Sequence, residues 1–149
     1  MQAAFQTLTG TLGAVSFSII FNVRGKKLAV SAAGAAVSWM VYLFFVHMGR
    51  DKALGLLGAT VTAAILSEIF ARIVKVPVMI LLVPMIMPLV PGGDLYYATT
   101  WLVQGNRTEA GAYLTLLIRE AGAIAFGIIL VTCIVQVGMR VIHHFSKKS

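Results

Sequence analysis

The chain has 149 residues, of which 59% are apolar and only 11% are charged. Soluble domains carry about 25% charged residues, so a mean hydropathy of +0.92 excludes a water-soluble single domain. The 12 Lys and Arg exceed the 5 Asp and Glu, but they form short clusters between apolar runs, which is typical of topology determinants and not of a nucleic-acid surface. We therefore expect one transmembrane domain over residues 1–149, in the inner cell membrane.

The apolar runs between the charges predict five spans, because a membrane helix needs roughly 17–25 mostly apolar residues. They are expected at residues 3–21, 28–47, 53–70, 76–104, with a break at 84–93, and 108–140. The predicted fold class is all-α, a polytopic membrane helix bundle with a proline- and glycine-broken fourth helix.

The distribution of basic residues predicts the orientation of these spans, since cytoplasmic loops carry an excess of Lys and Arg. With the N-terminus outside and the C-terminus inside, 8 of the 12 basic residues are cytoplasmic: Arg24, Lys26, Lys27, Arg72, Lys75, Arg140, Lys147 and Lys148. If the fourth segment only dipped into the membrane and returned, the basic residues would be divided more evenly between the two sides. The pattern therefore favours five crossings.

Small residues recur every four positions in two spans: Gly10, Ala14 and Ser18 in the first, and Gly55, Ala59, Ala63 and Ser67 in the third. This spacing places them on one helix face, where a neighbouring helix can approach closely. The neighbour is expected within the same chain, with a second subunit as the alternative.

The fourth segment contains Pro84, Pro88 and Pro91 followed by Gly92 and Gly93. Each proline removes a backbone donor and disfavours a helical conformation at the preceding residue, here Val83, Met87 and Val90. Asp94 is expected to cap a new helix after the glycines. The pattern predicts two half-helices around an unwound centre inside the bilayer.

An unwound centre survives in hydrocarbon only inside protein or beside a watery cavity, and secondary transporters use such breaks to bind substrate. The predicted substrate-binding residues are Pro88, Pro91, Gly92, Gly93, Asp94 and Tyr97. The N-terminus of the second half-helix would receive a substrate carboxylate. The structural alternative is a proline-kinked helix without a ligand.

The runs Ser67–Glu68–Ile–Phe–Ala–Arg72, Lys75–Val–Pro77, Pro84–Met–Ile–Met–Pro88–Leu–Val–Pro91–Gly92 and Tyr96–Tyr97 resemble the threonine/serine exporter family. The similarity covers nearly the whole chain and is greatest to the small subunit, or C-terminal half, of these exporters. It departs at Met85, where the resemblance implies glycine. The resemblance implies export of small amino acids or dicarboxylates together with a larger membrane subunit.

The remaining ionisable residues have two interpretations each. Glu68 and Arg72, four apart, are expected either as an interfacial ion pair or as a site at which Glu68 binds a coupling proton or a substrate ammonium. Arg119 and Glu120 are expected as a pair at the outer interface. No spacing of His, Cys and acidic residues resembles a metal site, and no cofactor is expected.

The leading hypothesis is one subunit of a proton-coupled secondary exporter for threonine, serine or related small carboxylates. Five helices are too few to enclose a pathway, so we expect a larger subunit of the same family, a homo-oligomer, or both. A non-transporting assembly or regulatory subunit is the alternative. An intramembrane enzyme is not expected, because no Ser–His or paired Asp constellation lies at membrane depth.

Overall fold

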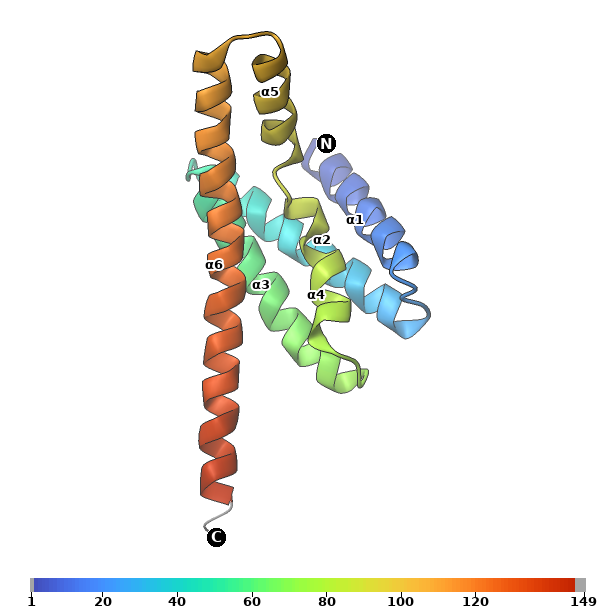
Figure 1. Cartoon of the computed structure of the whole chain (residues 1–149). Coiled ribbons are helices and arrows are strands. Elements are labelled where there is room, and N and C mark those ends of the chain that lie inside the picture. The colour runs from blue at the N-terminus through green and yellow to red at the C-terminus, as the bar shows by residue number, and fades with distance from the viewer. Residues whose placement is uncertain (1, 147–149) are drawn as a thin grey trace.

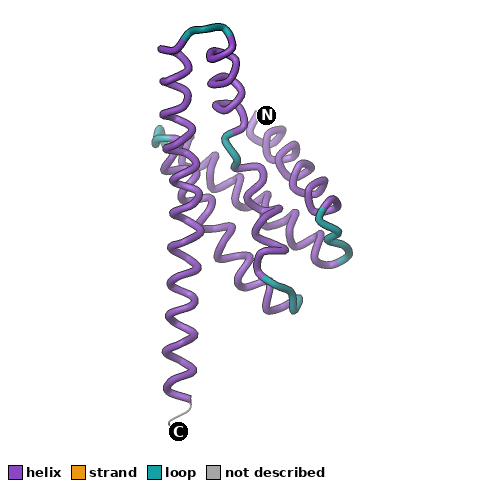
Figure 2. The backbone as a smooth tube through the Cα atoms, viewed as in Figure 1, coloured by secondary structure: helices purple, strands orange, loops and turns teal. Residues whose placement is uncertain are grey.

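In the computed structural model, which describes residues 2–146, every element is a helix and none of these residues belongs to a strand. Figure 1 shows α1 (Gln2–Ile20), α2 (Lys26–His47), α3 (Lys52–Ile73), α4 (Val78–Ile86), the 3₁₀ turn η1 (Met87–Leu89), α5 (Gly92–Val103) and α6 (Arg107–Ser146). The connections between them are short (Figure 2). The all-helical class is confirmed, while Lys147 and Lys148, counted above for orientation, lie outside the described residues.

Three helices of the described chain are long and apolar enough to cross a membrane: α2, α3 and the Arg107–Arg140 part of α6. A fourth span results if Val78–Leu89 and Gly92–Val103, which are bent by 56° at their junction, count as one. The first predicted span contains a shorter apolar helix, Ala4–Ile20. A membrane bundle of three or four candidate spans is thus shown, and the fifth span and the orientation stay predictions.

The helices pack around α3 and α4. Helix α2 runs antiparallel to α3, α1 covers α2, α4 contacts both α2 and α3, and α6 lies along α3 (Figure 1). The largest buried cluster joins α3, α4 and α6 through seven apolar side chains: Ala63, Ala64, Ala71, Leu81, Leu82, Met85 and Val131. A short apolar α4 can therefore be enclosed by longer helices on its two sides.

The small-residue faces pack within the chain, as expected. Ala14, Ala59 and Ala63 are fully buried, and the hydroxyls of Ser18 on α1 and Ser31 on α2 lie 3.1 Å apart in a buried hydrogen bond. Such interhelical hydroxyl bonds average about 0.6 kcal/mol in membrane proteins. Close helix approach, rather than bulky side chains, holds this part of the bundle together.

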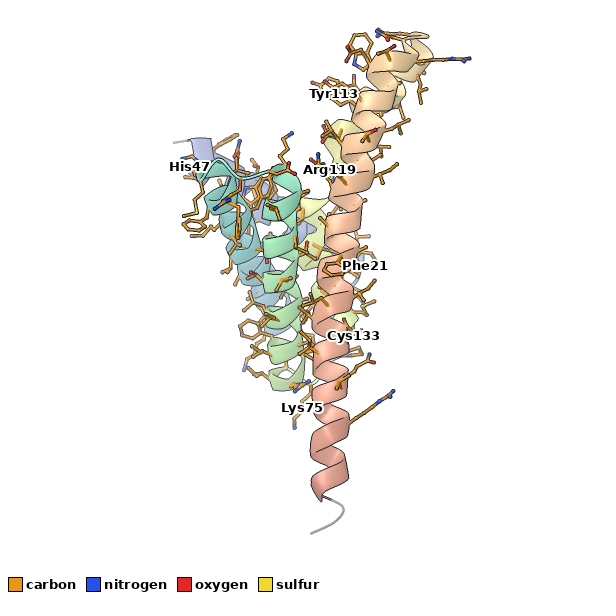
Figure 3. The ribbon with its side chains drawn as sticks, turned by 90° about the vertical axis from the view of Figure 1, so that its left-hand side faces the viewer. Phe21, His47, Lys75, Tyr113, Arg119 and Cys133 are labelled. Carbon is orange, nitrogen blue, oxygen red and sulfur yellow. The ribbon has the colours of Figure 1, made fainter. Side chains whose placement is uncertain are left out.

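Two contacts between α3 and α6 show how these helices are aligned along their axes. The Arg119 guanidinium pairs with Asp51 at the start of α3, and Arg72 Nη2 lies 3.4 Å from Met139 Sδ near its end. At 1.5 Å per residue the two levels are about 30 Å apart on either helix, which equals the thickness of a bilayer core. Figure 3 shows Arg119 beside the α2–α3 loop and Tyr113 farther out along α6. The α5–α6 hairpin therefore projects beyond the Asp51 level.

Candidate functional site

The fourth segment is interrupted between α4 and α5, at residues 87–91 rather than over the whole of 84–93. Met87 to Leu89 form the 3₁₀ turn, and Val90 is extended, with φ −62° and ψ 128°, because it precedes Pro91. Pro91 itself has φ −76° and ψ 61°, after which α5 begins at Gly92. The predicted break is present but shorter.

The expectation that all three prolines disrupt the helix was wrong for Pro84. Pro84 lies inside α4, and Pro88 lies in the first turn of η1, where its missing donor costs no bond. Met87 before Pro88 remains helical, with φ −53° and ψ −42°. Pro84 is fully buried, and in membrane helices tertiary neighbours allow such a proline to remain.

The start of α5 also differs from the expectation. Asp94 does not cap the helix, because α5 begins two residues earlier and Asp94 lies in its first turn. Pro91 occupies the N-cap position and makes no side-chain hydrogen bond there. The backbone N–H groups at this N-terminus and its positive dipole end therefore point toward the break.

A cavity of about 190 Å³ lies at the break. The chain around the junction supplies one side of it, and α2, the first turns of α3, and α6 supply the others. It is lined by Trp39, Tyr42, Lys52, Leu56, Pro88, Leu89, Val90, Pro91, Gly92, Gly93, Asp94 and Glu120. Because Lys52 and Glu120 adjoin Asp51 and Arg119, the cavity lies at the Asp51 end of the bundle and not halfway along the span.

Two carboxyl groups from different helices meet in this cavity. Glu120 of α6 is only 4% exposed, and its carboxyl group faces that of Asp94 on α5 in the same cavity. Lys52 at the start of α3 acts electrostatically on Glu120. The cavity thus holds two acidic groups, one ammonium group and a helix N-terminus.

Aromatic side chains of α2 form the opposite wall. The Trp39 and Tyr42 rings lie with centroids 5.1 Å apart. The Trp39 Nε1 atom is buried and has no hydrogen-bond partner among the described residues, although buried indole N–H groups usually find one. The Trp39 side chain therefore leaves a buried donor free beside the cavity.

The cavity gathers five of the six predicted substrate-binding residues: Pro88, Pro91, Gly92, Gly93 and Asp94. Tyr97 does not line it. The Tyr97 ring stacks on Tyr113 of α6, with centroids 5.3 Å apart and planes 29° apart, so it joins the two helices of the projecting hairpin.

The predicted pair Glu68–Arg72 is present, with Arg72 Nη2 3.2 Å from Glu68 Oε2. It lies near the other end of α3, where these residues border a separate pocket of about 130 Å³ with Val135 of α6. The structure therefore does not bring Glu68 and the break together. The role of Glu68 in proton coupling stays a prediction.

The expected outer pair Arg119–Glu120 was wrong. Arg119 is an exposed partner of Asp51, whereas Glu120 is buried in the cavity, because successive residues of an α-helix point about 100° apart. The signal was present in the sequence. Glu120 continues, at helical spacing, the face of α6 that carries the half-buried Ile124 and the buried Gly127 and Val131.

Residues 6–134 match the family model described as "Threonine/Serine exporter, ThrE". This match covers well over half of the chain and includes the break, Lys52 and Glu120. No curated protein and no solved structure matches the chain.

Proposed function

The chain belongs to the threonine/serine exporter family, and on this premise we propose that it is a subunit of a secondary exporter that binds a small amino acid in the cavity at the α4–α5 break. The observation that carries the proposal is the combination of acidic and basic groups there. Asp94, Glu120 and Lys52 reach one cavity from three different helices.

An amino acid carries one positive and one negative group, and the cavity offers partners for both. The carboxyl groups of Asp94 and Glu120 would accept hydrogen bonds from the substrate ammonium. The Lys52 ammonium and the N–H groups at the start of α5 would bind the substrate carboxylate. The free N–H of Trp39 supplies one more donor.

The threonine or serine hydroxyl needs only a small polar partner, and the Tyr42 hydroxyl on the cavity wall can provide one. A cavity of about 190 Å³ also favours small side chains over large ones. Small dicarboxylates would place a second negative charge near Asp94 and Glu120, which disfavours them. We therefore propose zwitterionic substrates.

Transport requires that the cavity open alternately to the two sides. The break joins α4, which is packed in the core, to α5 in the projecting hairpin (Figure 1), and relative movement of these parts would change access to the cavity.

We further propose that a second membrane subunit of the family, another copy of this chain, or both complete the pathway. The proton gradient across the inner membrane would drive export of the substrate through this pathway.

A non-transporting assembly subunit is the second candidate, since many large apolar side chains on the outer faces of the bundle are exposed.

The test replaces Lys52, the one cationic side chain among the described residues that line the cavity. In proteoliposomes made with the complete membrane complex, Lys52→Gln should raise the half-saturating concentration of labelled L-threonine or L-serine about tenfold, because a hydrogen bond to a charged group is worth about 1.5–3 kcal/mol. Lys26→Gln, which removes an equal charge far from the cavity, is the matched control.

A subunit that only assembles the complex would give another result. Lys52→Gln would then change only the amount of complex, or have no effect. The half-saturating concentration would equal that of the unaltered protein.

A further inference from the structure

The carboxyl groups of Asp94 and Glu120 line the same cavity and face each other there. Two carboxylates so placed repel each other unless a proton lies between them. The pair comes from α5 and α6, so each carboxyl group depends on the other helix for its partner. One proton shared between the two carboxyl groups would remove this repulsion.

The charged and polar groups around Asp94 and Glu120 determine what else these two carboxyl groups can bind. Lys52 faces Glu120 from α3, Asp51 lies at the same level, and Tyr42 faces it from α2. The charge of Asp51 is countered by Arg119, with which it pairs. Among the described residues that line the cavity, Lys52 is then the one cation that can balance a single negative charge on the pair.

We propose, on the basis of the function proposed above, that this shared proton and the substrate ammonium compete for the carboxyl groups of Asp94 and Glu120, which makes the pair the coupling site of the exporter. When the cavity is open to the inside, the pair loses its proton to water, and both carboxylates then bind the substrate ammonium. When the cavity is open to the outside, a proton from water binds one carboxylate. The substrate ammonium then leaves the cavity and keeps its own protons.

This cycle moves one proton inward for each amino acid that moves outward, and no bond other than those to the proton changes. It also requires the pair to be reachable from the outer side. In the orientation predicted from the basic residues, the end of the span near Asp51 and Arg119, where the cavity lies, faces outward and so meets this requirement. Glu68, near the opposite end, is then a structural ion-pair partner of Arg72.

The experiment has two readouts on the purified complex in lipid. The first is the infrared band of a protonated carboxyl group at neutral pH, measured without substrate and then with saturating L-threonine. The second is the half-saturating concentration for L-threonine counterflow over about pH 5 to about pH 8, where competition with one proton changes it by up to about tenfold per pH unit.

The unaltered complex should show the carboxyl band, lose it on addition of threonine, and bind threonine more weakly as the pH falls. Glu120→Gln and Asp94→Asn should each remove the band and flatten the pH dependence, because an amide cannot take up the proton. Glu120→Asp should restore part of both. Glu109→Gln, at the exposed start of α6, is the matched control and should change neither.

Three outcomes would overturn the inference: a band that persists in both amide variants, a pH dependence that Glu120→Gln leaves intact, or a pH dependence that Glu68→Gln removes instead. The failure of the proposed function looks different. In that case the band is present and sensitive to Glu120→Gln, but no small amino acid affects it or exchanges across the membrane.

Discussion

Glu120 and Asp94 acquire their role from their surroundings, because a carboxyl group inside a membrane bundle is expensive unless it has partners. Glu120 is the one acidic side chain among the buried polar groups of the described chain. Its partners come from α5 and from the start of α3, and both of these depend on how the break orients the chain. The role of Glu120 therefore depends on its location in the bundle and not on its residue type.

At this scale the glycines after the break offer a direct test. No other side chain or distant backbone atom lies within 4 Å of a Cβ built on Gly92 or Gly93, and neither has a positive φ. Gly92→Val and Gly93→Val should therefore leave the protein in the membrane, while efflux of labelled threonine falls sharply because the added side chain takes up space at the cavity.

The measurement is efflux per complex, with membrane abundance followed by immunoblotting. Gly111→Val, at a position on α6 that also has no neighbour within 4 Å, controls for the added bulk. Efflux at the normal rate from both variants would remove the cavity from the transport pathway.

Among the elements, α4 depends most on close packing. A Cβ on Gly34 of α2 would lie 2.5 Å from both Cε and Sδ of Met85, so the absence of a side chain at Gly34 makes room for methionine. Met85 is fully buried and lies at the one position where the chain departs from the family resemblance. The flexible thioether fills the space between α2 and α4.

This contact predicts coupling between the two positions. Gly34→Ala should destabilise the bundle by about 1–3 kcal/mol through overpacking, and Met85→Ala by about 2–5 kcal/mol through the cavity it leaves. In the double variant the new methyl group occupies part of that cavity, so the combined loss should be smaller than the sum. Thermal unfolding in detergent measures all three, and strict additivity would contradict the contact.

For the whole molecule, the contacts between α3 and α6 define the part that fits within a bilayer. The Asp51–Arg119 and Arg72–Met139 contacts lie about 30 Å apart, and α5 with the first turns of α6 extends about 18 Å past the former level. Cys133 on α6 is exposed on the surface between these levels, as Figure 3 shows.

This arrangement predicts an accessibility pattern for single cysteines in a Cys133→Ala background. With the N-terminus outside, Arg50→Cys, Asn106→Cys and Ala112→Cys should react with a membrane-impermeant maleimide added to intact cells. Lys27→Cys and Lys75→Cys should react only after the cells are opened.

Protection of Ala112→Cys would place the hairpin within the lipid and contradict its projection beyond the bilayer. Labelling of Lys27→Cys in intact cells would instead reverse the orientation and leave the fold unchanged.

Much of the fold and part of the site could be predicted from the sequence. Apolar run length predicted the long helices, and the spacing of Ala59 and Ala63 predicted a buried face. Proline and glycine chemistry predicted the break and the residues next to it. Helical spacing could have placed Glu120 on the buried face of α6, but its meeting with Lys52 and Trp39 could not be predicted. These three residues lie far apart in the sequence and meet only when α2, α3 and α6 pack.

Hydropathy and the missing proline donors act locally and need no partner, so they were enough to predict a helical membrane protein with an interrupted fourth segment. The packed helices were needed to show that the helix continues through Pro84, that the break lies at the Asp51 end, and that Asp94 faces Glu120. These outcomes depend on side chains from separate helices, and their distances are set by packing and not by spacing along the chain.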